Sequence, residues 1–178
     1  MRCCFIILLL SSSFAIAAQD PLPPVGLWRE HLPYNSAIDV TAGNGIVYCA
    51  TPYSLFSVNN IENSIERYSR ISGLNETGIS AIQFDIANNK LFIAYSNSNI
   101  DILYRNDIYN VPDIKRSAII GDKTIYQIYP LGNEYYLSTG IGIVVINGDK
   151  YEVKDSWFIG NGGNPVKVNG VTSDGTFF

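Results

Sequence analysis

The sequence is poor in the residue types on which metal binding and acid–base catalysis depend. Its 178 residues include one histidine and three cysteines, and they form no His/Cys cluster with the spacing of a zinc site. His31 precedes the first predicted strand, so a Ser/His/Asp site would need partners from across the whole fold. The composition therefore predicts a non-enzymatic protein without a metal or other cofactor.

Charge is also sparse, and its balance is not positive. Charged residues make up 16% of the chain and the formal net charge is −4, whereas nucleic-acid-binding domains carry a basic surface. We therefore expect no nucleic-acid partner. Aromatic residues reach 12%, with 12 tyrosines. That content suits sheets that pack on both faces, and it equally suits a surface that binds sugars through tyrosine rings.

The N-terminus has the features of an export signal. Arg2 provides the positive start, Cys3–Leu10 the apolar run, and Ala15–Ala17 a small-residue cleavage pattern. The run is too short to span a bilayer, so we expect no transmembrane span. We predict a signal peptide over residues 1–18 and an exported mature chain, located in the periplasm or at the outer-membrane surface.

Removal of this signal would leave Cys49 as the one remaining cysteine. The mature chain could then form no intramolecular disulfide. Cys49 falls in the middle of a predicted strand, where we expect a buried small apolar residue rather than a reactive thiol.

A 44-residue repeat runs three times through the chain. It shows as columns of similar residues 44 apart, namely Ile38/Ile82/Tyr126, Val40/Phe84/Ile128, Tyr48/Phe92/Tyr136, Ala50/Ala94/Ser138, Phe56/Ile100/Val144 and Val58/Ile102/Ile146. Repeats of about 40–45 residues that contain four short strands are typical of β-propeller blades. Within each repeat, apolar residues alternate between Asn/Gly turns, as in strands and hairpins.

The sequence thus predicts an all-β protein, a β-propeller with four-stranded antiparallel blades and no helix after the N-terminus. The expected inner strands are Ile38–Thr41, Ile79–Phe84 and Thr124–Tyr129. The expected fourth strands lie near Glu66–Ser69, Ile114–Ala118 and Tyr151–Ser156.

A fourth blade is predicted to begin near the C-terminus. Val171–Phe178 is similar to Val40–Tyr48 with one residue fewer, and it would turn at Asp174–Gly175. About three blades and part of a fourth make an incomplete ring, since propellers have roughly four to eight blades. We expect residues 19–178 to be the truncated N-terminal part of a propeller domain, with Trp28–Leu32 as an outer strand meant for a last blade that the chain does not contain.

Several runs resemble known propellers. Gly73–Ile82, followed by Asn89–Ala94, resembles the two-component regulator propeller repeat of Bacteroidetes. Trp28–Tyr34, Val47–Val58 and Ile93–Ile102 resemble the first propeller of the PorZ family, outer-surface components of the type IX secretion system.

The second resemblance implies a binding and assembly module of the cell surface. PorZ-like proteins are associated with delivering anionic lipopolysaccharide to a sortase-like partner, so the implied partners are proteins of a surface secretion complex together with lipopolysaccharide or a glycan. The alternative is the periplasmic, glycan-sensing propeller of a hybrid two-component regulator, which uses the same repeats. The Trp28–Leu32 segment favours the secretion component.

No motif fixes a ligand. Propellers generally bind at a face formed by loops between strands, which makes Tyr34, Asn35, Tyr53 and Tyr95 candidate contacts, beside the loop Asn75–Thr77.

Other polar residues have a structural and a functional interpretation. We expect Asp39, Asp85 and Asp101 to accept hydrogen bonds from turn amides rather than to act as acids or bases. Gly160–Asn164 would be either an anion-binding loop or a connection between blades, and Asn97–Asn99 is interpreted as a turn.

Overall fold

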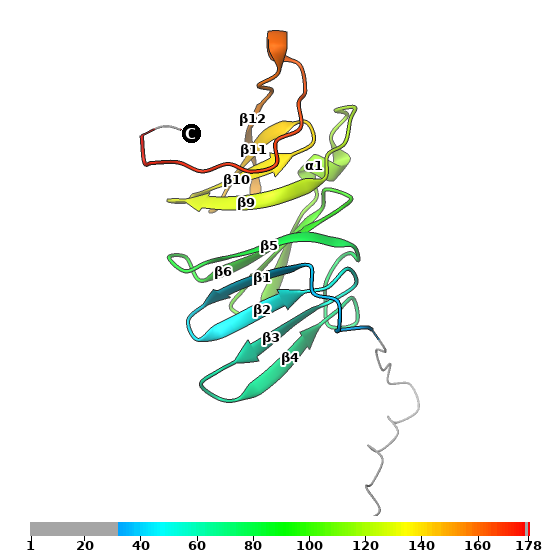
Figure 1. The fold of residues 1–178 in the computed structure, drawn as a ribbon, viewed down its shortest axis with the longest axis vertical. Helices are drawn as coiled ribbons and strands as arrows, with labels where there is room; N and C mark the ends of the chain where they lie inside the picture. Colours follow the sequence, from blue (N-terminus) through cyan, green and yellow to red (C-terminus); the bar gives the residue numbers. More distant parts are fainter. Residues whose placement is uncertain (1–31, 177) are drawn as a thin grey trace, which may run out of the picture.

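The computed structural model describes residues 32–176 and 178, and these consist mainly of β-strands and the turns between them (Figure 1). Twelve strands in this part of the chain form three four-stranded antiparallel sheets that lie side by side. In each sheet the strands follow chain order. The prediction of an all-β propeller with four-stranded blades is confirmed.

Each blade takes its strands from one stretch of sequence. Blade 1 contains β1 (Asp39–Gly43), β2 (Ile46–Ala50), β3 (Leu55–Asn59) and β4 (Ser64–Tyr68). Blade 2 contains β5 (Ile79–Asp85), β6 (Lys90–Tyr95), β7 (Ile100–Tyr104) and β8 (Asp107–Val111). Blade 3 contains β9 (Ile125–Leu131), β10 (Glu134–Thr139), β11 (Gly142–Asn147) and β12 (Glu152–Trp157).

The first strand of each blade is the inner one, as predicted. β5 lies beside both β1 and β9 and so joins the three sheets (Figure 1). Side chains of β1 accept hydrogen bonds from backbone N–H groups of β5: Ile82 donates to Asp39 at 2.8 Å and Phe84 donates to Thr41 at 3.0 Å. These hydrogen bonds fix the position of β5 along β1.

The 44-residue repeat places equivalent residues in successive apolar cores. Tyr48, Phe92 and Tyr136 are each the third residue of the second strand. Tyr48 packs between blades 1 and 2, Phe92 between blades 2 and 3, and Tyr136 on the far side of blade 3. The repeat assignment is therefore confirmed for the second strands.

Blade 2 departs from the repeat in its first strand. By the 44-residue period Ile93 should pair with Phe84, as Cys49 pairs with Val40, but it pairs with Ile82. The reason is that residues 86–89 form a loop of four residues where blades 1 and 3 turn with two. The two predicted columns through this strand are wrong for blade 2.

The third strand of blade 2 is also displaced, by one residue. Phe92 pairs with Ile102 rather than with Asp101, because residues 95–99 are one residue longer than the matching loop 51–54. A one-residue shift exchanges the two faces of a strand. As a result Ile102 faces blade 3, and its predicted counterpart Ile146 faces back toward blade 2 in the same core.

The fourth strand of blade 2 was predicted in the wrong place. It is β8, and the predicted segment 114–118 instead overlaps α1, a helix of one turn (Asp113–Arg116). β8 follows a two-residue turn in which Arg105 and Asn106 both have positive φ, 51° and 71°. Such turns usually carry Gly, so the Arg105-Asn106 pair did not indicate a turn in the sequence. The other two fourth strands lie where they were expected.

The predicted start of a fourth blade is only partly formed. Residues 171–176 contain no strand, because no second strand lies beside them in the described part of the chain. Val171 is nevertheless buried, and its N–H donates to the Gln127 side chain at 2.7 Å. It thus lies against β9 as Ile82 lies against β1. The predicted signal peptide, His31 and residues 28–31 of the predicted outer strand lie outside the described residues, and Leu32 is in no strand.

Candidate functional site

The predicted ligand contacts lie at one end of the sheets. In each antiparallel blade, the loop before the first strand and the loop between the second and third strands are at the same end. Tyr34 and Asn35 precede β1, Tyr53 lies in the loop after β2, and Asn75–Thr77 precedes β5. We call this end the loop face.

Two of the candidates are accessible and one is partly packed. Asn35 is exposed and Tyr53 keeps 53% of its surface exposed. Tyr34 is half-buried, since its ring meets Phe56 edge-on at 5.8 Å and Arg67 lies 5.3 Å from its centroid.

Tyr95 differs from the other candidates. Its side chain has 0% exposure and its hydroxyl donates to Asp101 at 2.6 Å. Burial and the adjacent Asp101 carboxylate raise the pKa of Tyr95 above its ordinary value. Its ring cannot contact a surface ligand in this arrangement, so the structure speaks against Tyr95 as a binding residue and makes it part of the core.

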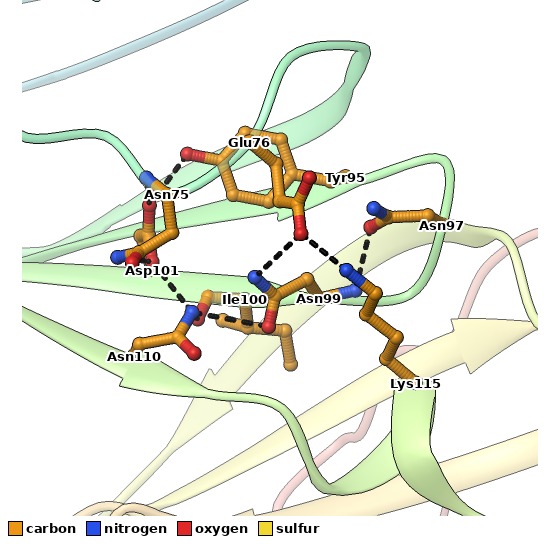
Figure 2. Close-up of polar contacts among 9 residues, drawn as sticks. All are labelled: Asn75, Glu76, Tyr95, Asn97, Asn99, Ile100, Asp101, Asn110 and Lys115. Carbon is orange, nitrogen blue, oxygen red and sulfur yellow. Dashed lines mark hydrogen bonds and ion pairs between the residues drawn. The ribbon is translucent and has the colours of Figure 1, made fainter. Parts of the chain in front are cut away.

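Asp101 is the centre of a polar network beneath the loop face (Figure 2). Its carboxylate is fully buried and accepts four hydrogen bonds. The donors are the Asn75 N–H and side-chain amide, both at 2.8 Å, the Tyr95 hydroxyl, and the Asn110 amide at 2.9 Å. A buried carboxylate needs this degree of hydrogen bonding to be tolerated. Asp101 therefore holds the loop Asn75–Thr77 against β7 and β8.

A second set of contacts lies above this network, nearer the surface. Glu76 forms an ion pair with Lys115 of α1 and accepts a longer hydrogen bond from Asn99 at 3.5 Å (Figure 2). The Lys115 ammonium holds the pKa of Glu76 below its ordinary value, although burial acts in the opposite direction. Asn97 accepts from the Asn99 N–H at 3.1 Å, as in an Asx turn, so the predicted turn is confirmed.

Sequence reasoning found only part of this network. It placed Asp101 correctly as an acceptor for a loop amide. It missed Asn110 and Lys115, because the fourth strand and α1 of blade 2 were not recognised.

The opposite end of the sheets carries a related carboxylate. Asp85 is buried and accepts from the N–H groups of Ala87 and Asn88, from the Asn88 amide, and from the Tyr135 hydroxyl of blade 3 at 2.6 Å. Asp39 likewise accepts from the N–H of Ile82. The expectation that these carboxylates accept from turn amides is therefore confirmed for Asp85 and Asp101, whereas the Ile82 amide that Asp39 accepts belongs to a strand of the next blade.

A buried lysine closes the same end of the junction between blades 2 and 3. Lys90 is 8% exposed, and its ammonium donates to the Gly148 carbonyl at 2.6 Å. It also lies 5.5 Å from the ring centroid of Tyr104 and 4.9 Å from that of Tyr151. Such cation–π contacts favour an ammonium that has lost water.

The corresponding region between blades 1 and 2 is open. It is a groove of about 290 Å³. Its lining is mostly polar and consists of Ile46, Tyr48, Ser57, Asn59, Glu62, Ser64, Glu66, Tyr68, Phe84, Asn89, Leu103, Arg105 and Asn106. We call it the junction groove. No feature of the sequence pointed to it.

The remaining candidates are explained by the fold. Cys49 is buried and unpaired, and burial followed by the Asp39 charge raises the pKa of its thiol, as expected for a core cysteine. In the loop 160–164, the Gly160 and Gly163 N–H groups bind carbonyls of the loop itself. Those two N–H groups are not available to an anion in this conformation.

The described part of the chain offers neither a cluster of metal ligands nor a membrane-spanning helix. Residues 32–176 and 178 contain no group of three or more His, Cys, Asp or Glu side chains placed to hold a metal ion. They also contain no helix long and apolar enough to cross a membrane.

Solved structures show the same fold. PorZ of Porphyromonas gingivalis, described as an essential bacterial surface component of the type IX secretion system, superposes with a TM-score of 0.63 at 29% identity. The match covers 68% of this chain and 17% of PorZ, so the chain spans only about a sixth of that protein.

Two further structures are more distant in sequence. The extracellular domain of the putative hybrid two-component system BT4673 from B. thetaiotaomicron gives a TM-score of 0.57 at 10% identity, covering 67% of this chain and 16% of that one. AztD from Citrobacter koseri gives 0.54 at 12% identity, covering 76% and 36%. Both show the fold alone.

No curated protein matches the sequence. The family described as "TSS9, PorZ, N-terminal beta-propeller domain" matches residues 47–176, which include blade 1 from the second residue of β2 onward and the whole of blades 2 and 3. On this match, the chain belongs to the family of PorZ N-terminal β-propeller domains of the type IX secretion system.

Proposed function

We propose that this propeller is a non-enzymatic binding and assembly module through which its protein takes part in type IX secretion at the bacterial surface. The family match over residues 47–176 carries the proposal. The 29% identity to PorZ adds to it, because the more distant propellers share only the fold.

The internal chemistry supports a structural rather than a catalytic role. The buried carboxylates of Asp85 and Asp101 are each surrounded by hydrogen-bond donors that come from the fold itself. Such acceptors hold loops in position and have little capacity left for proton transfer to a substrate. Their effect is to make the loop face and the blade junctions rigid.

The finer role follows the family. We propose that the complete protein helps to deliver anionic lipopolysaccharide to a sortase-like partner, as the resemblance to PorZ-like proteins implies. Export through a signal peptide over residues 1–18 belongs to this proposal. So does a location at the outer-membrane surface, which agrees with the description of PorZ as a bacterial surface component.

The loop face supplies the contacts that remain candidates for a ligand. Tyr53 and Asn35 are exposed there, and Tyr34 offers a half-buried ring. Replacement of Tyr53 by Ala should weaken binding of lipopolysaccharide to the purified protein if this face takes part. An unchanged affinity would remove Tyr53 from the candidates.

Deletion of the gene tests the proposed function. Secretion of type IX cargo into the medium should fall sharply in the deletion strain and return on complementation with the intact gene. Normal secretion in the deletion strain would contradict the proposal.

The same deletion strain distinguishes the secretion function from the second candidate function, that of a glycan-sensing propeller of a hybrid two-component regulator. That function predicts normal cargo secretion together with loss of a transcriptional response to a glycan. The BT4673 likeness at 10% identity shows only that the extracellular domain of that two-component system shares the fold, so the secretion role is the one we favour.

A further inference from the structure

The junction groove and the Lys90 site occupy equivalent positions in successive blade junctions. Strand pairing makes Ile46 the counterpart of Lys90, since both begin the second strand of their blade. By the same register, Asn59 corresponds to Tyr104, because Ser57 pairs with Tyr48 as Ile102 pairs with Phe92.

The residues that blade 2 contributes to the first junction correspond in the same way to those that blade 3 contributes to the second. Leu103 pairs with Ile108, as Ile146 pairs with Val153, so Arg105 and Asn106 stand where Gly148 and Tyr151 stand in blade 3. Four residues that form the Lys90 site, namely Lys90, Tyr104, Gly148 and Tyr151, thus correspond to Ile46, Asn59, Arg105 and Asn106. All four counterparts line the junction groove.

The two junctions are filled differently. Between blades 2 and 3, the Lys90 chain and two tyrosine rings occupy the space, and Lys90 is 8% exposed. Between blades 1 and 2, Ile46 is shorter than lysine and asparagines replace both tyrosines. The result is a groove of about 290 Å³, near the lower end of the ~300–1,000 Å³ typical of small-ligand sites.

The charges that line the groove are mainly negative. Glu62 and Glu66 contribute two carboxylates, and neither takes part in an ion pair within the described residues. Glu66 also accepts from the Tyr68 hydroxyl at 2.5 Å, which holds the carboxylate at the wall. The Arg105 guanidinium lies 4.9 Å from the centroid of the Tyr104 ring. Its charge is thus stabilised by that ring.

We infer that the junction groove binds the ammonium group of a lysine side chain supplied by a partner polypeptide. The incoming chain takes the place that Lys90 takes in the next junction. Its methylene groups lie along Ile46 and Leu103, and its ammonium lies near Glu62 and Glu66. A long alkyl chain with a terminal cation is the ligand shape that the neighbouring junction already accommodates.

A second groove extends the site for a polypeptide. It has the same size, about 290 Å³, and shares Glu66, Tyr68, Leu103 and Asn106 with the first. It continues past Arg67, Ser72 and Ile108 along the outer strands. Residues on either side of the lysine can therefore lie along the open edge of the two blades. This identification of the partner as a protein rests on the proposed assembly function.

The test uses two matched peptides and the purified protein. The probes are acetyl-Gly-Ser-Lys-Ser-Gly-amide and the same peptide with norleucine, which keeps the alkyl chain and lacks the charge. The lysine peptide should shift the backbone amide signals of Ser64 and Asn106 in a saturable way, and the norleucine peptide should not. Added salt should weaken the effect, because the carboxylates are near the surface.

Four variants locate the site. Combined Glu62→Gln and Glu66→Gln substitutions should weaken binding of the lysine peptide roughly fivefold to tenfold, whereas Glu152→Gln, outside the groove, should not. Ile46→Lys should fill the groove from within and abolish binding. Ile46→Met is the uncharged control and should leave the affinity nearly unchanged.

Several results would overturn the inference. They are the absence of saturable binding by the lysine peptide, equal binding by the norleucine peptide, or unchanged affinity in the double Gln variant. Binding of a neutral oligosaccharide in place of the peptide would also overturn it. If the lysine peptide does not bind, the inference about the groove fails and the proposed secretion function is unaffected. If the deletion strain secretes cargo normally, the proposed function itself fails.

Discussion

The Tyr135 hydroxyl of blade 3 donates to the Asp85 carboxylate of blade 2 at 2.6 Å, across 50 residues of sequence. Tyr135 has no exposed surface, and its ring packs on Phe92 with centroids 3.8 Å apart. One side chain thus combines apolar packing between blades with a hydrogen bond to a buried charge. The blade junction depends on both.

We expect Tyr135→Phe to destabilise the protein by about 1–3 kcal/mol, the range for a hydrogen bond to a charged group. The ring packing is kept, so the loss measures the hydroxyl. Tyr109→Phe, at a residue 39% exposed, is the control and should change stability by less than about 0.5 kcal/mol. Urea unfolding of the two variants would show equal stability if the Asp85 contact contributed nothing.

The destabilisation caused by Tyr135→Phe should depend on pH. Burial alone would raise the pKa of Asp85, but hydrogen bonds from Tyr135 and Asn88 lower it below its ordinary value of 3.8. A carboxylate with a lowered folded-state pKa stabilises the fold above the unfolded-state pKa, and this stability is lost as pH falls through the folded-state value. The stability difference between wild type and Tyr135→Phe should therefore be full near neutral pH and shrink below about pH 3.8. A constant difference across this range would contradict the assignment.

Asp101→Asn should destabilise the loop face. The substitution places an amide donor where Asn75, Tyr95 and Asn110 all donate, so at least one buried donor loses its acceptor. We expect a loss of about 1–3 kcal/mol and faster hydrogen exchange at the Asn75 N–H. Asp149→Asn, at an exposed turn, serves as the control. Slow exchange at Asn75 in the Asp101→Asn variant would show that other contacts hold this loop.

Lys90→Met should weaken the junction between blades 2 and 3. Methionine keeps the alkyl chain but removes the hydrogen bond to the Gly148 carbonyl and both cation–π contacts. The expected loss is about 1–2 kcal/mol, read as a lower midpoint of unfolding. Lys150→Met removes a lysine whose side chain is 69% exposed and should have little effect. Equal midpoints for the two variants would show that the Lys90 ammonium does not stabilise the junction.

Gly142→Ala should be costly, whereas Gly132→Ala should cost less. Both glycines have positive φ, 140° and 63°. A Cβ at position 142 would lie 2.2 Å from the Trp157 carbonyl oxygen, and one at position 132 would meet nothing within 4 Å. We expect a loss of about 2 kcal/mol or more for Gly142→Ala and about 1 kcal/mol for Gly132→Ala. Thermal unfolding would contradict this prediction if the order were reversed.

The junction groove shows what sequence reasoning could not find. Ile46 and Lys90 are one 44-residue repeat apart, but Glu62 and Arg105 belong to turns whose lengths differ between blades. Whether a repeat position is filled or open depends on side chains from two blades together. The alignment of repeats shows only one blade at a time.

The sequence by itself determined the all-β class, the blade repeat and the second strand of every blade, because alternating apolar residues and Asn/Gly turns are local signals. It also indicated the PorZ-like family through runs of consecutive residues. The tertiary structure decided the register of β5, which a loop two residues longer shifts by two positions, and the faces of β7, which a loop one residue longer shifts by one position and so exchanges. It also decided which side chains meet between blades, such as Asp85 with Tyr135, because packing across a junction joins residues that no local pattern relates.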